Sequence, residues 1–366
     1  MLLILLVSFA GSLLATLAVI VSSHRHAHFS SDSDLSGPQK MHREAVPRIG
    51  GVGIFAGLLA GAALAAFTLP DRRHEILLFL VCTLPAFLSG LWEDFTKAIS
   101  PRRRMVALAL SGTLGVLLLD GVIVRTGFLP LDHLLLANGL AWTGIAGAIF
   151  GVTGVSNSVN IIDGLNGLAS MCVAMMAAAL SWIAYQVGDT LVATFALATL
   201  GATLGFFVWN YPHGKVFLGD GGAYVLGFIV AELGILVSAR HPQVSMLAPL
   251  LIVVYPFFET LFSMYRRRVL QGRSMTQPDG IHLHTLIYRR LRRDPAGNVR
   301  RANSGTSPFL WLLAAVGIVP AAIWWDNSPV LSVALLAFVL AYITLYWRIV
   351  RFRSPGWMKA RRQATR

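Results

Sequence analysis

The stretch FLGDGGAYVLGFIVAELGILVS, residues 217–238, sets the class of fold. It is apolar almost throughout, and only Asp220 and Glu232 carry charge at neutral pH. A run of ~20 predominantly apolar residues in an α-helix is long enough to cross the hydrocarbon core of a membrane. We therefore expect residues 217–238 to form a membrane-spanning helix.

The rest of the chain has the same apolar character. Of its 366 residues, 55% are hydrophobic and only 13% are charged, about half the charged share of a typical soluble domain. Eleven stretches have spanning length: 2–22, 49–69, 75–91, 105–124, 134–155, 166–186, 189–209, 217–238, 243–265, 309–325 and 329–349. We predict an all-α polytopic membrane protein with about 11 transmembrane helices, organised as a single integral membrane domain over residues 1–366.

The basic residues orient these helices. Of the 30 Lys and Arg residues, only Arg72, Arg73, Arg125 and Arg240 lie in one set of alternate connections, and the other set and the C-terminal tail hold the rest. Because Lys and Arg concentrate in cytoplasmic loops, we predict that the richer side is cytoplasmic, with the N-terminus outside and the C-terminus inside. This assignment gives a large cytoplasmic loop at 266–308 with an interfacial amphipathic helix, and a basic cytoplasmic tail at 350–366.

Composition also excludes some kinds of function. The chain has only two cysteines, Cys82 and Cys172, and both lie inside apolar runs, so a disulfide framework is excluded. The formal net charge is +13, and in a membrane protein such an excess reflects topology and contact with anionic lipid headgroups. We therefore expect membrane lipids as partners and no nucleic acid.

Acidic residues gather on the predicted cytoplasmic side. Those on or near that boundary are Glu93, Asp94, Asp163, Asp220, Glu259 and Asp279. Ionised groups at this depth cost several kcal/mol unless they are paired, hydrated or bound to a cation. Acids grouped on the side richest in basic residues therefore suggest a site where a metal ion and a polyanion meet.

Two polar segments carry the strongest signal, and they overlap the expected short connections 156–165 and 210–218. In residues 157–168, NSVNIIDGLNGL, the side chains of Asn157, Asn160 and Asp163 recur every three residues and would share one stripe of a helix. Hydrogen bonding between helices uses asparagine but needs neither the acid nor the glycines after it, so we favour a polar ligand pocket. In NYPHGKVFLGDGG, residues 210–222, the acid stands among glycines, which suits a hard-cation ligand beside exposed backbone for phosphate oxygens.

Two weaker segments lie on the same side. Residues 46–53, VPRIGGVG, form a Pro-then-Gly helix start, which serves close packing more often than a ligand. Glu93 and Asp94 are adjacent at the end of a helix and point in different directions. Such a pair can divide metal binding and proton transfer between them, or it can be a solvated helix end.

A third weak segment is amphipathic. Residues 281–293, if helical, place leucine and isoleucine on one side and His and Arg on the other, as an interfacial helix does. Arg292 and Arg293 suit contact with anionic lipid. His282 and His284 stand next to the acids and suit contact with a pyrophosphate.

These blocks, together and in this order, resemble the polyprenyl-phosphate N-acetylhexosamine-1-phosphate transferases, glycosyltransferase family 4, from about Gly37 to Arg293. Thr285 stands where the phospho-MurNAc-pentapeptide translocases of that family have a fuller His run, so the resemblance favours the undecaprenyl-phosphate GlcNAc-1-phosphate transferase type. It implies an enzyme of the bacterial inner (cytoplasmic) membrane with its active site on the cytoplasmic side. Such an enzyme transfers a sugar-1-phosphate from a UDP-N-acetylhexosamine to undecaprenyl phosphate, releases UMP and initiates a surface polysaccharide such as O-antigen, outer core or capsule.

The resemblance also implies roles for individual residues. The catalytic residues would be Glu93, Asp94, Asp163 and Asp220, and Asp220 and Asp94 would bind Mg²⁺, with Mn²⁺ as the alternative ion. The substrate-binding residues would be Lys40, His42, Asn157, Asn160, Gly164, Leu165, Asn166, Asn210, Phe217, His282, His284 and Arg289. Phe217 matches a position that stacks on uracil. Both substrates are anions, so the metal ion would reduce their repulsion and polarise the phosphoryl group.

The chain departs from the family pattern at two positions, and other functions stay open. Glu93 replaces a usual aspartate, and Asn166 replaces a common acid. A transporter or flippase would place polar residues along several helices, whereas only Glu232 lies inside one. A non-catalytic scaffold for polysaccharide assembly is the remaining alternative, and the sequence leaves a homodimer open.

Overall fold

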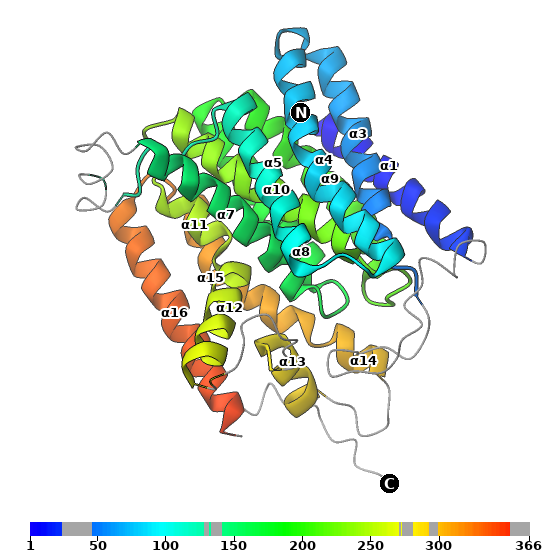
Figure 1. Ribbon diagram of the computed structural model, residues 1–366, viewed down its shortest axis with the longest axis vertical. Coiled ribbons are helices and arrows are strands. Elements are labelled where there is room, and N and C mark those ends of the chain that lie inside the picture. Colours follow the sequence, from blue (N-terminus) through cyan, green and yellow to red (C-terminus); the bar gives the residue numbers. More distant parts are fainter. Residues whose placement is uncertain are drawn as a thin grey trace.

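In a computed structural model the protein is a bundle of long helices (Figure 1). The structure describes residues 1–23, 46–127, 132, 141–270, 272, 281–292 and 299–351, with the backbone alone at 141, 270, 291, 292, 299 and 300. Every regular element in these ranges is a helix. The predicted all-α polytopic architecture is therefore confirmed.

The helices divide into long and short ones. The long ones are α1 (Leu2–Val21), α3 (Gly50–Thr68), α4 (Arg73–Thr96), α5 (Pro101–Leu119), α7 (Ala141–Ile162), α8 (Leu168–Val187), α9 (Thr190–Asn210), α10 (Gly219–Arg240), α15 (Ser307–Ile323) and α16 (Ser328–Val350). The short ones are η1 (Pro70–Arg72), α11 (Leu247–Ile252), α12 (Val254–Tyr265), η2 (Arg266–Leu270), α13 (Leu283–Ile287), η3 (Tyr288–Arg292) and α14 (Val299–Ser304). Within the described ranges, 9 helices are long and apolar enough to cross a membrane, and they coincide with all the predicted stretches except 105–124 and 243–265.

Those two stretches differ from the prediction for identifiable reasons. The stretch 243–265 is divided at Val253 into α11 and α12, because Pro256 lacks an N–H group and its ring clashes with the carbonyl one turn earlier. The stretch 105–124 is helical only to Leu119, where Asp120 takes a left-handed conformation with φ +58°. The prediction of helix over the last residues of that stretch is wrong.

Helix α7 runs further than expected, so the prediction of a polar connection at 156–165 is wrong over most of its length. The hydroxyls of Ser156 and Ser158 donate to the carbonyls of Val152 and Gly154 one turn earlier. These polar side chains therefore satisfy their hydrogen bonds within the helix, which continues to Ile162. As a result the asparagines of this segment lie on a helix.

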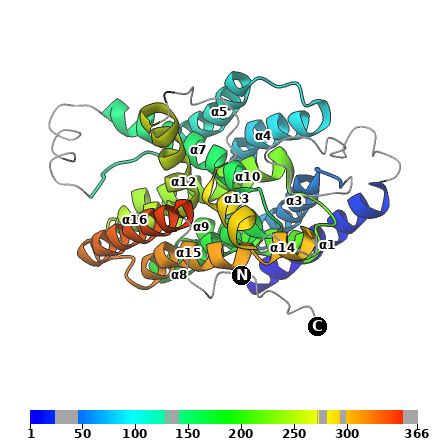
Figure 2. The same ribbon diagram turned by 90° about the horizontal axis from the view of Figure 1, so that it is seen from below.

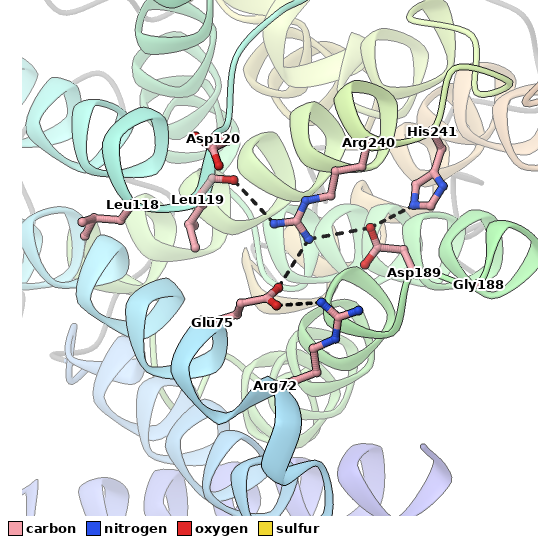
Figure 3. Close-up of a pocket in the computed structure, with 9 residues that line it drawn as sticks. All are labelled: Arg72, Glu75, Leu118, Leu119, Asp120, Gly188, Asp189, Arg240 and His241. Carbon is pink, nitrogen blue, oxygen red and sulfur yellow. Dashed lines mark hydrogen bonds and ion pairs between the residues drawn. The ribbon is translucent and has the colours of Figure 1, made fainter.

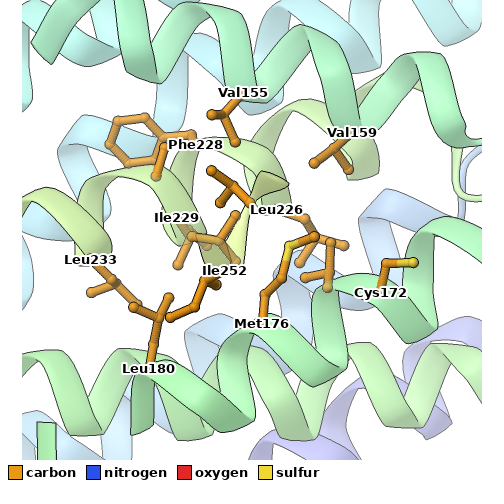
Figure 4. Packing of buried hydrophobic residues seen from close by; sticks show 14 of the residues in the cluster. Val155, Val159, Cys172, Met176, Leu180, Leu226, Phe228, Ile229, Leu233 and Ile252 are labelled. Atoms are coloured by element: carbon orange, nitrogen blue, oxygen red, sulfur yellow. The ribbon is translucent and has the colours of Figure 1, made fainter. Parts of the chain in front are cut away.

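Helix α10, the stretch that opened the sequence analysis, is the central helix. Seen from below, it lies among α3, α4, α7 and α9 (Figure 2). It is buried along almost its whole length, whereas fewer than a third of the residues of α1 and α16 are buried. Leu226, Ile229 and Leu233 pack against apolar side chains of α7, α8 and α11 (Figure 4). The start of α10 is therefore held on several sides.

Small residues bring α1, α3 and α9 into close contact. A Cβ atom added to Gly57 of α3 would lie 2.5 Å from the carbonyl oxygen of Ser8 and 2.7 Å from Cβ of Ser12. One added to Gly205 of α9 would lie 2.5 Å from the carbonyl oxygen of Phe9. Membrane helices associate through such close packing, because lipid tails are as apolar as the side chains.

One end of the bundle carries an ion-pair network formed by Arg72, Glu75, Asp189, Arg240 and His241 (Figure 3). Arg72 Nη1 lies 2.6 Å from Glu75 Oε1. Arg240 Nη1 lies 3.8 Å from Glu75 Oε2 and 3.9 Å from Asp189 Oδ2, and His241 Nε2 lies 3.1 Å from the same Asp189 oxygen. The network lines a pocket of about 430 Å³ and joins connections that we predicted to lie on the outer side.

Candidate active site

The opposite end of α10 begins at a carboxylate from another helix. Asp94, in the last turn of α4, accepts hydrogen bonds from the backbone N–H of Asp220 at 2.8 Å and of Gly221 at 3.0 Å. The first N–H groups of a helix have no partner within it, and the helix dipole favours negative charge there. Asp94 is only 1% exposed. It therefore holds the start of α10.

Two glycines permit this arrangement. A Cβ atom added to Gly90, one turn before Asp94, would lie 2.5 Å from the backbone of both Asp220 and Gly221. Gly219 has φ +74°, and a Cβ atom there would collide with the carbonyl oxygen of Arg48. The Pro-then-Gly start of α3 also packs here, since Gly50 and Gly51 donate backbone hydrogen bonds to the carbonyls at 217 and 218. The packing interpretation of that segment is confirmed.

Asp220 lies in the first turn of α10, and its carboxylate is surrounded by donors. Asn160 Nδ2 of α7 donates to Oδ1 at 2.8 Å, and Arg104 Nη1 of α5 donates to Oδ2 at 3.3 Å. Arg48 Nη2 lies 3.7 Å from Oδ1 and 3.9 Å from Asp94 Oδ1. Two guanidinium groups thus face two carboxylates at this end of the bundle.

The two arginines are site residues that sequence reasoning missed. Arg48 stands inside the Pro-then-Gly segment, and Arg104 ends a basic cluster that served only to orient the helices. Arg104 Nη1 also donates a hydrogen bond to the hydroxyl of Tyr224 at 3.3 Å. Their sequence signal is the positive-inside pattern itself, which does not separate a topological arginine from one at a site.

Asn157 and Asp163 present polar groups without hydrogen-bond partners. Both are partly exposed, and neither side chain has a hydrogen bond to any residue that the structure describes. Removal from water raises the pKa of the Asp163 carboxyl to about 7; repulsion by Asp220 adds to the rise, and Arg48 opposes it. Asn157 and Asn160 lie in the last turns of α7, and Asp163 follows directly after it. Since only Asn160 is engaged by Asp220, the side chains of Asn157 and Asp163 are available to a ligand.

The His segment docks onto this end. A Cβ atom added to Gly164 would lie 2.5 Å from Nε2 of His284, and the rings of His282 and His284 are parallel, with centroids 5.5 Å apart. The predicted helix is present as α13 followed by η3. Its residues from Leu283 to Ile287 are buried against the protein, which brings both histidines to the α7–α8 turn.

Two of the predicted substrate-binding asparagines are engaged within the protein. Asn166 Nδ2 donates to the carbonyl of Pro212 at 3.2 Å, and its backbone N–H donates to Asn303 at 2.8 Å. Asn210 accepts from the N–H of Gly167 at 2.6 Å and donates to the carbonyl of Val216 at 2.8 Å. These contacts hold the loops around the site, and contact of either residue with substrate stays a prediction.

The remaining predicted residues are placed as follows. Glu93 turns away from Asp94 and accepts from the N–H of Ile99 at 2.7 Å, so the two acids do point in different directions. Leu165 is buried beside the α7–α8 turn and Phe217 is partly exposed. Arg289 lies exposed on η3, and Lys40 and His42 lie outside the described residues.

The carboxylates of this site are oxygen donors of the kind that bind a magnesium ion. No group of three or more His, Cys, Asp or Glu side chains that could hold a metal ion occurs within the ranges the structure describes. Mg²⁺ commonly takes one or two carboxylates and completes its shell with water and substrate phosphates. Asp220, with Asp163 close by, matches that requirement. Asp94 gives both oxygens to the start of α10, and its role as a metal ligand stays a prediction.

Fold and site together define a polytopic membrane protein with an acidic, arginine-paired site at one end of its helix bundle. Residues 76–238 match the model of glycosyl transferase family 4. The chain is 24% identical to a probable undecaprenyl-phosphate N-acetylglucosaminyl 1-phosphate transferase from Bacillus subtilis (strain 168), over 93% of this chain and 92% of the relative. It is 29% identical to the undecaprenyl-phosphate alpha-N-acetylglucosaminyl 1-phosphate transferase of Yersinia pestis, over 86% and 84%.

A relative of a second kind also matches. The phospho-N-acetylmuramoyl-pentapeptide-transferase of Bacillus cytotoxicus is 30% identical over 55% of this chain and 64% of the relative. The chain is therefore similar to glycosyl transferase family 4 in its central segment and to two N-acetylglucosaminyl 1-phosphate transferases over most of its length. The resemblance predicted from the order of the polar blocks is therefore confirmed, and the two relatives matched over most of the chain are named for N-acetylglucosaminyl 1-phosphate transfer.

Proposed function

We propose that this protein transfers a sugar-1-phosphate from a UDP-N-acetylhexosamine to undecaprenyl phosphate, forming a lipid-linked sugar pyrophosphate and releasing UMP. The single observation that carries the proposal is the placement of Asp220. It stands at the start of the central helix beside Asn160 and two arginines, inside the segment matched by the family model. Similarity to the Bacillus subtilis and Yersinia pestis proteins over most of the chain supports N-acetylglucosamine as the sugar.

The residues divide the task by chemistry. The lipid phosphate and the nucleotide are both anions, and Arg48 and Arg104 provide guanidinium groups that suit phosphate oxygens. Asp220 would hold Mg²⁺, which reduces repulsion between the two phosphates and polarises the phosphoryl group under attack. Asp94 keeps the first turn of α10 in place. Asn157 and Asp163 offer unpartnered polar groups for the nucleotide.

The chemistry of the two substrates indicates where in the membrane the site lies. A membrane-anchored phosphate meets a soluble nucleotide at the level of the lipid headgroups, so the site belongs at one end of the spanning helices. The end that holds Asp220 also carries the connections rich in Lys and Arg, which supports the cytoplasmic face of a bacterial inner membrane. Synthesis of a surface polysaccharide such as O-antigen, outer core or capsule is the pathway we propose for the product.

A transfer assay tests the proposal. Purified protein is incubated with undecaprenyl phosphate, Mg²⁺ and radiolabelled UDP-GlcNAc, UDP-GalNAc or a UDP-linked 6-deoxy N-acetyl sugar. We expect a butanol-extractable product and release of UMP with one donor, and neither without added lipid phosphate. If the folded protein transfers no sugar and binds no uridine nucleotide, the proposal is wrong and the transporter and scaffold alternatives take its place.

A further inference from the structure

A buried glutamate behind the His segment has no role in the chemistry described so far. Glu259 of α12 is fully buried. Its Oε1 accepts from His282 Nδ1 at 3.0 Å and from the backbone N–H of Leu283 at 3.1 Å, and its Oε2 accepts from the hydroxyl of Tyr342 at 2.7 Å. This one carboxylate therefore joins α12, the start of α13 and α16.

The geometry fixes which nitrogen of His282 faces the glutamate. An ionised carboxylate only accepts hydrogen bonds, so Nδ1 of the ring must carry the proton. That leaves Nε2 as the nitrogen available to another group. A second proton on Nε2 would make the ring an imidazolium, whose charge the Glu259 carboxylate would offset.

The orientation of the His282 ring affects the candidate site through its contact with His284. Its ring is parallel to that of His284 within 3°, with centroids 5.5 Å apart. His284 in turn packs against Gly164, next to Asp163. Turning the His282 ring would therefore disturb the stack that covers the α7–α8 turn.

The other polar groups around His282 do not replace the glutamate. Tyr342 reaches Glu259 from α16, and Arg266 donates to the carbonyl of Ile281 at 3.0 Å from η2. Tyr255 of α12 is also buried near the carboxylate. Among the described groups facing this ring, Glu259 is the one acid that bonds to it.

We propose that Glu259 is a positioning residue for phosphate binding. It holds His282 with Nδ1–H directed at its carboxylate, so that Nε2–H of the imidazolium donates to a phosphate oxygen of the nucleotide-sugar. This role rests on the transfer reaction proposed above, in which the pyrophosphate of the donor lies at this end of the bundle.

Glu259→Gln tests the role, because it keeps the size of the side chain and removes the charge. Oε1 faces both the N–H of Leu283 and Nδ1 of His282, so the amide oxygen can still accept from both. The neutral amide no longer offsets the charge of an imidazolium, so Nε2 is left without the proton that it would donate to the phosphate. We expect KM for the UDP-sugar to rise about 10- to 100-fold, the size of one charge-assisted hydrogen bond. Turnover should change less, since the same contact is made before and during transfer.

Two further variants separate positioning from a purely structural task. Tyr342→Phe removes a hydrogen bond from the other carboxylate oxygen and should leave KM within about twofold, because His282 keeps its partner. His282→Ala should raise KM as much as Glu259→Gln, and the double variant should be no worse than either. If the two effects multiply instead, Glu259 acts independently of His282 and the proposal is overturned.

A readout that needs no activity distinguishes this proposal from the proposed function. Nitrogen NMR of histidine-labelled protein reports which ring nitrogen carries a proton, and comparison with His282→Ala assigns the signal. We expect protons on both ring nitrogens of His282 in the nucleotide-bound native protein, and on Nδ1 alone in Glu259→Gln. An unprotonated Nδ1 in the native protein would overturn the positioning role even where transfer is observed. Absence of transfer with the expected nitrogen signals would instead contradict the proposed function alone.

Discussion

At each end of this bundle an aspartate side chain accepts hydrogen bonds from the first N–H groups of a helix, but the aspartate comes from a different place in the chain. Asp189 is the cap residue of α9, where its side chain accepts from the N–H of Val192 at 3.0 Å, and it also pairs with Arg240 and His241. Asp94 accepts from the first N–H groups of α10, but it belongs to α4. One end caps a helix from within, and the other caps it from a neighbour.

That difference decides which charges are available. In the ion-pair network the capping carboxylate also serves as the counterion, so its interactions are satisfied inside the protein. At the start of α10 the cap comes from another helix, and the helix's own acid, Asp220, is released to face Asn160 and two arginines. A helix start capped from outside can therefore offer the carboxylate of its own first turn to a ligand.

The largest expected effect comes from making the same substitution at both ends. Asp220→Asn should lower transfer to undecaprenyl phosphate at least about 10²-fold, because the site loses the carboxylate proposed to bind the metal ion. Asp189→Asn should stay within about twofold, since asparagine caps a helix as well as aspartate. Radiolabel transfer measures both variants. Similar losses at the two ends would contradict the separation of roles.

A smaller loss of transfer activity should follow from displacing Asp94, which caps α10 from a neighbouring helix. Gly90→Ala places a Cβ atom 2.5 Å from the backbone at the start of α10, so α4 must shift and carry Asp94 with it. Misplacement of a site residue by about 1 Å can lower turnover about 10²-fold. Overpacking at Gly90 should also lower the free energy of unfolding by about 1–3 kcal/mol. The matched control is Gly151→Ala on α7, where nothing lies within 4 Å of an added Cβ. Normal turnover in Gly90→Ala would show that the cap tolerates displacement.

Metal binding tests the difference between Asp220 and Asp189 without an activity assay. With UDP present, Mg²⁺ should raise the thermal midpoint of the native protein and of Asp189→Asn, because a ligand of the folded state at 100 times its Kd stabilises by about 2.7 kcal/mol. Asp220→Asn should show little of this shift. Thermal unfolding followed by intrinsic fluorescence measures it, with EDTA as the reference. An equal shift in all three proteins would place the ion elsewhere.

The smallest effect is expected within the ion-pair network. Glu75→Gln removes two ion pairs, with Arg72 and with Arg240. Pairs between partly exposed side chains contribute about 0.2–1 kcal/mol each before salt screens them. The thermal midpoint should fall slightly at low salt and hardly at high salt, with transfer activity unchanged. A loss of activity in this variant would mean that the two ends are coupled.

Apolar run length was enough to predict which parts of the chain are helical, because the bilayer sets the length of a spanning segment. It failed where polar residues stay inside a helix, as in α7, and where Pro256 divides a run into α11 and α12. In both cases a local feature of the chain determines where the helix ends: serine hydroxyls that bond within α7, and a proline that lacks an N–H group.

The acids of the site could be found from sequence, but their division of labour could not. Glu93 and Asp94 are adjacent and chemically alike, and only the close approach at Gly90 shows which of them meets α10. Arg48 and Arg104 looked like topological charges until the fold brought them to Asp220. Glu259 and His282 are 23 positions apart in the sequence, so only the fold shows that their side chains are in contact.

The packing of α1 has a consequence for how the protein is made. Its small-residue faces contact α3, which follows soon after it, and α9, which begins at Thr190. A ribosome adding ~5–20 residues per second needs roughly 10–40 s to reach and complete α9. During that interval the surface of α1 that will meet α9 has no helix partner, and α1 can pack only against α3.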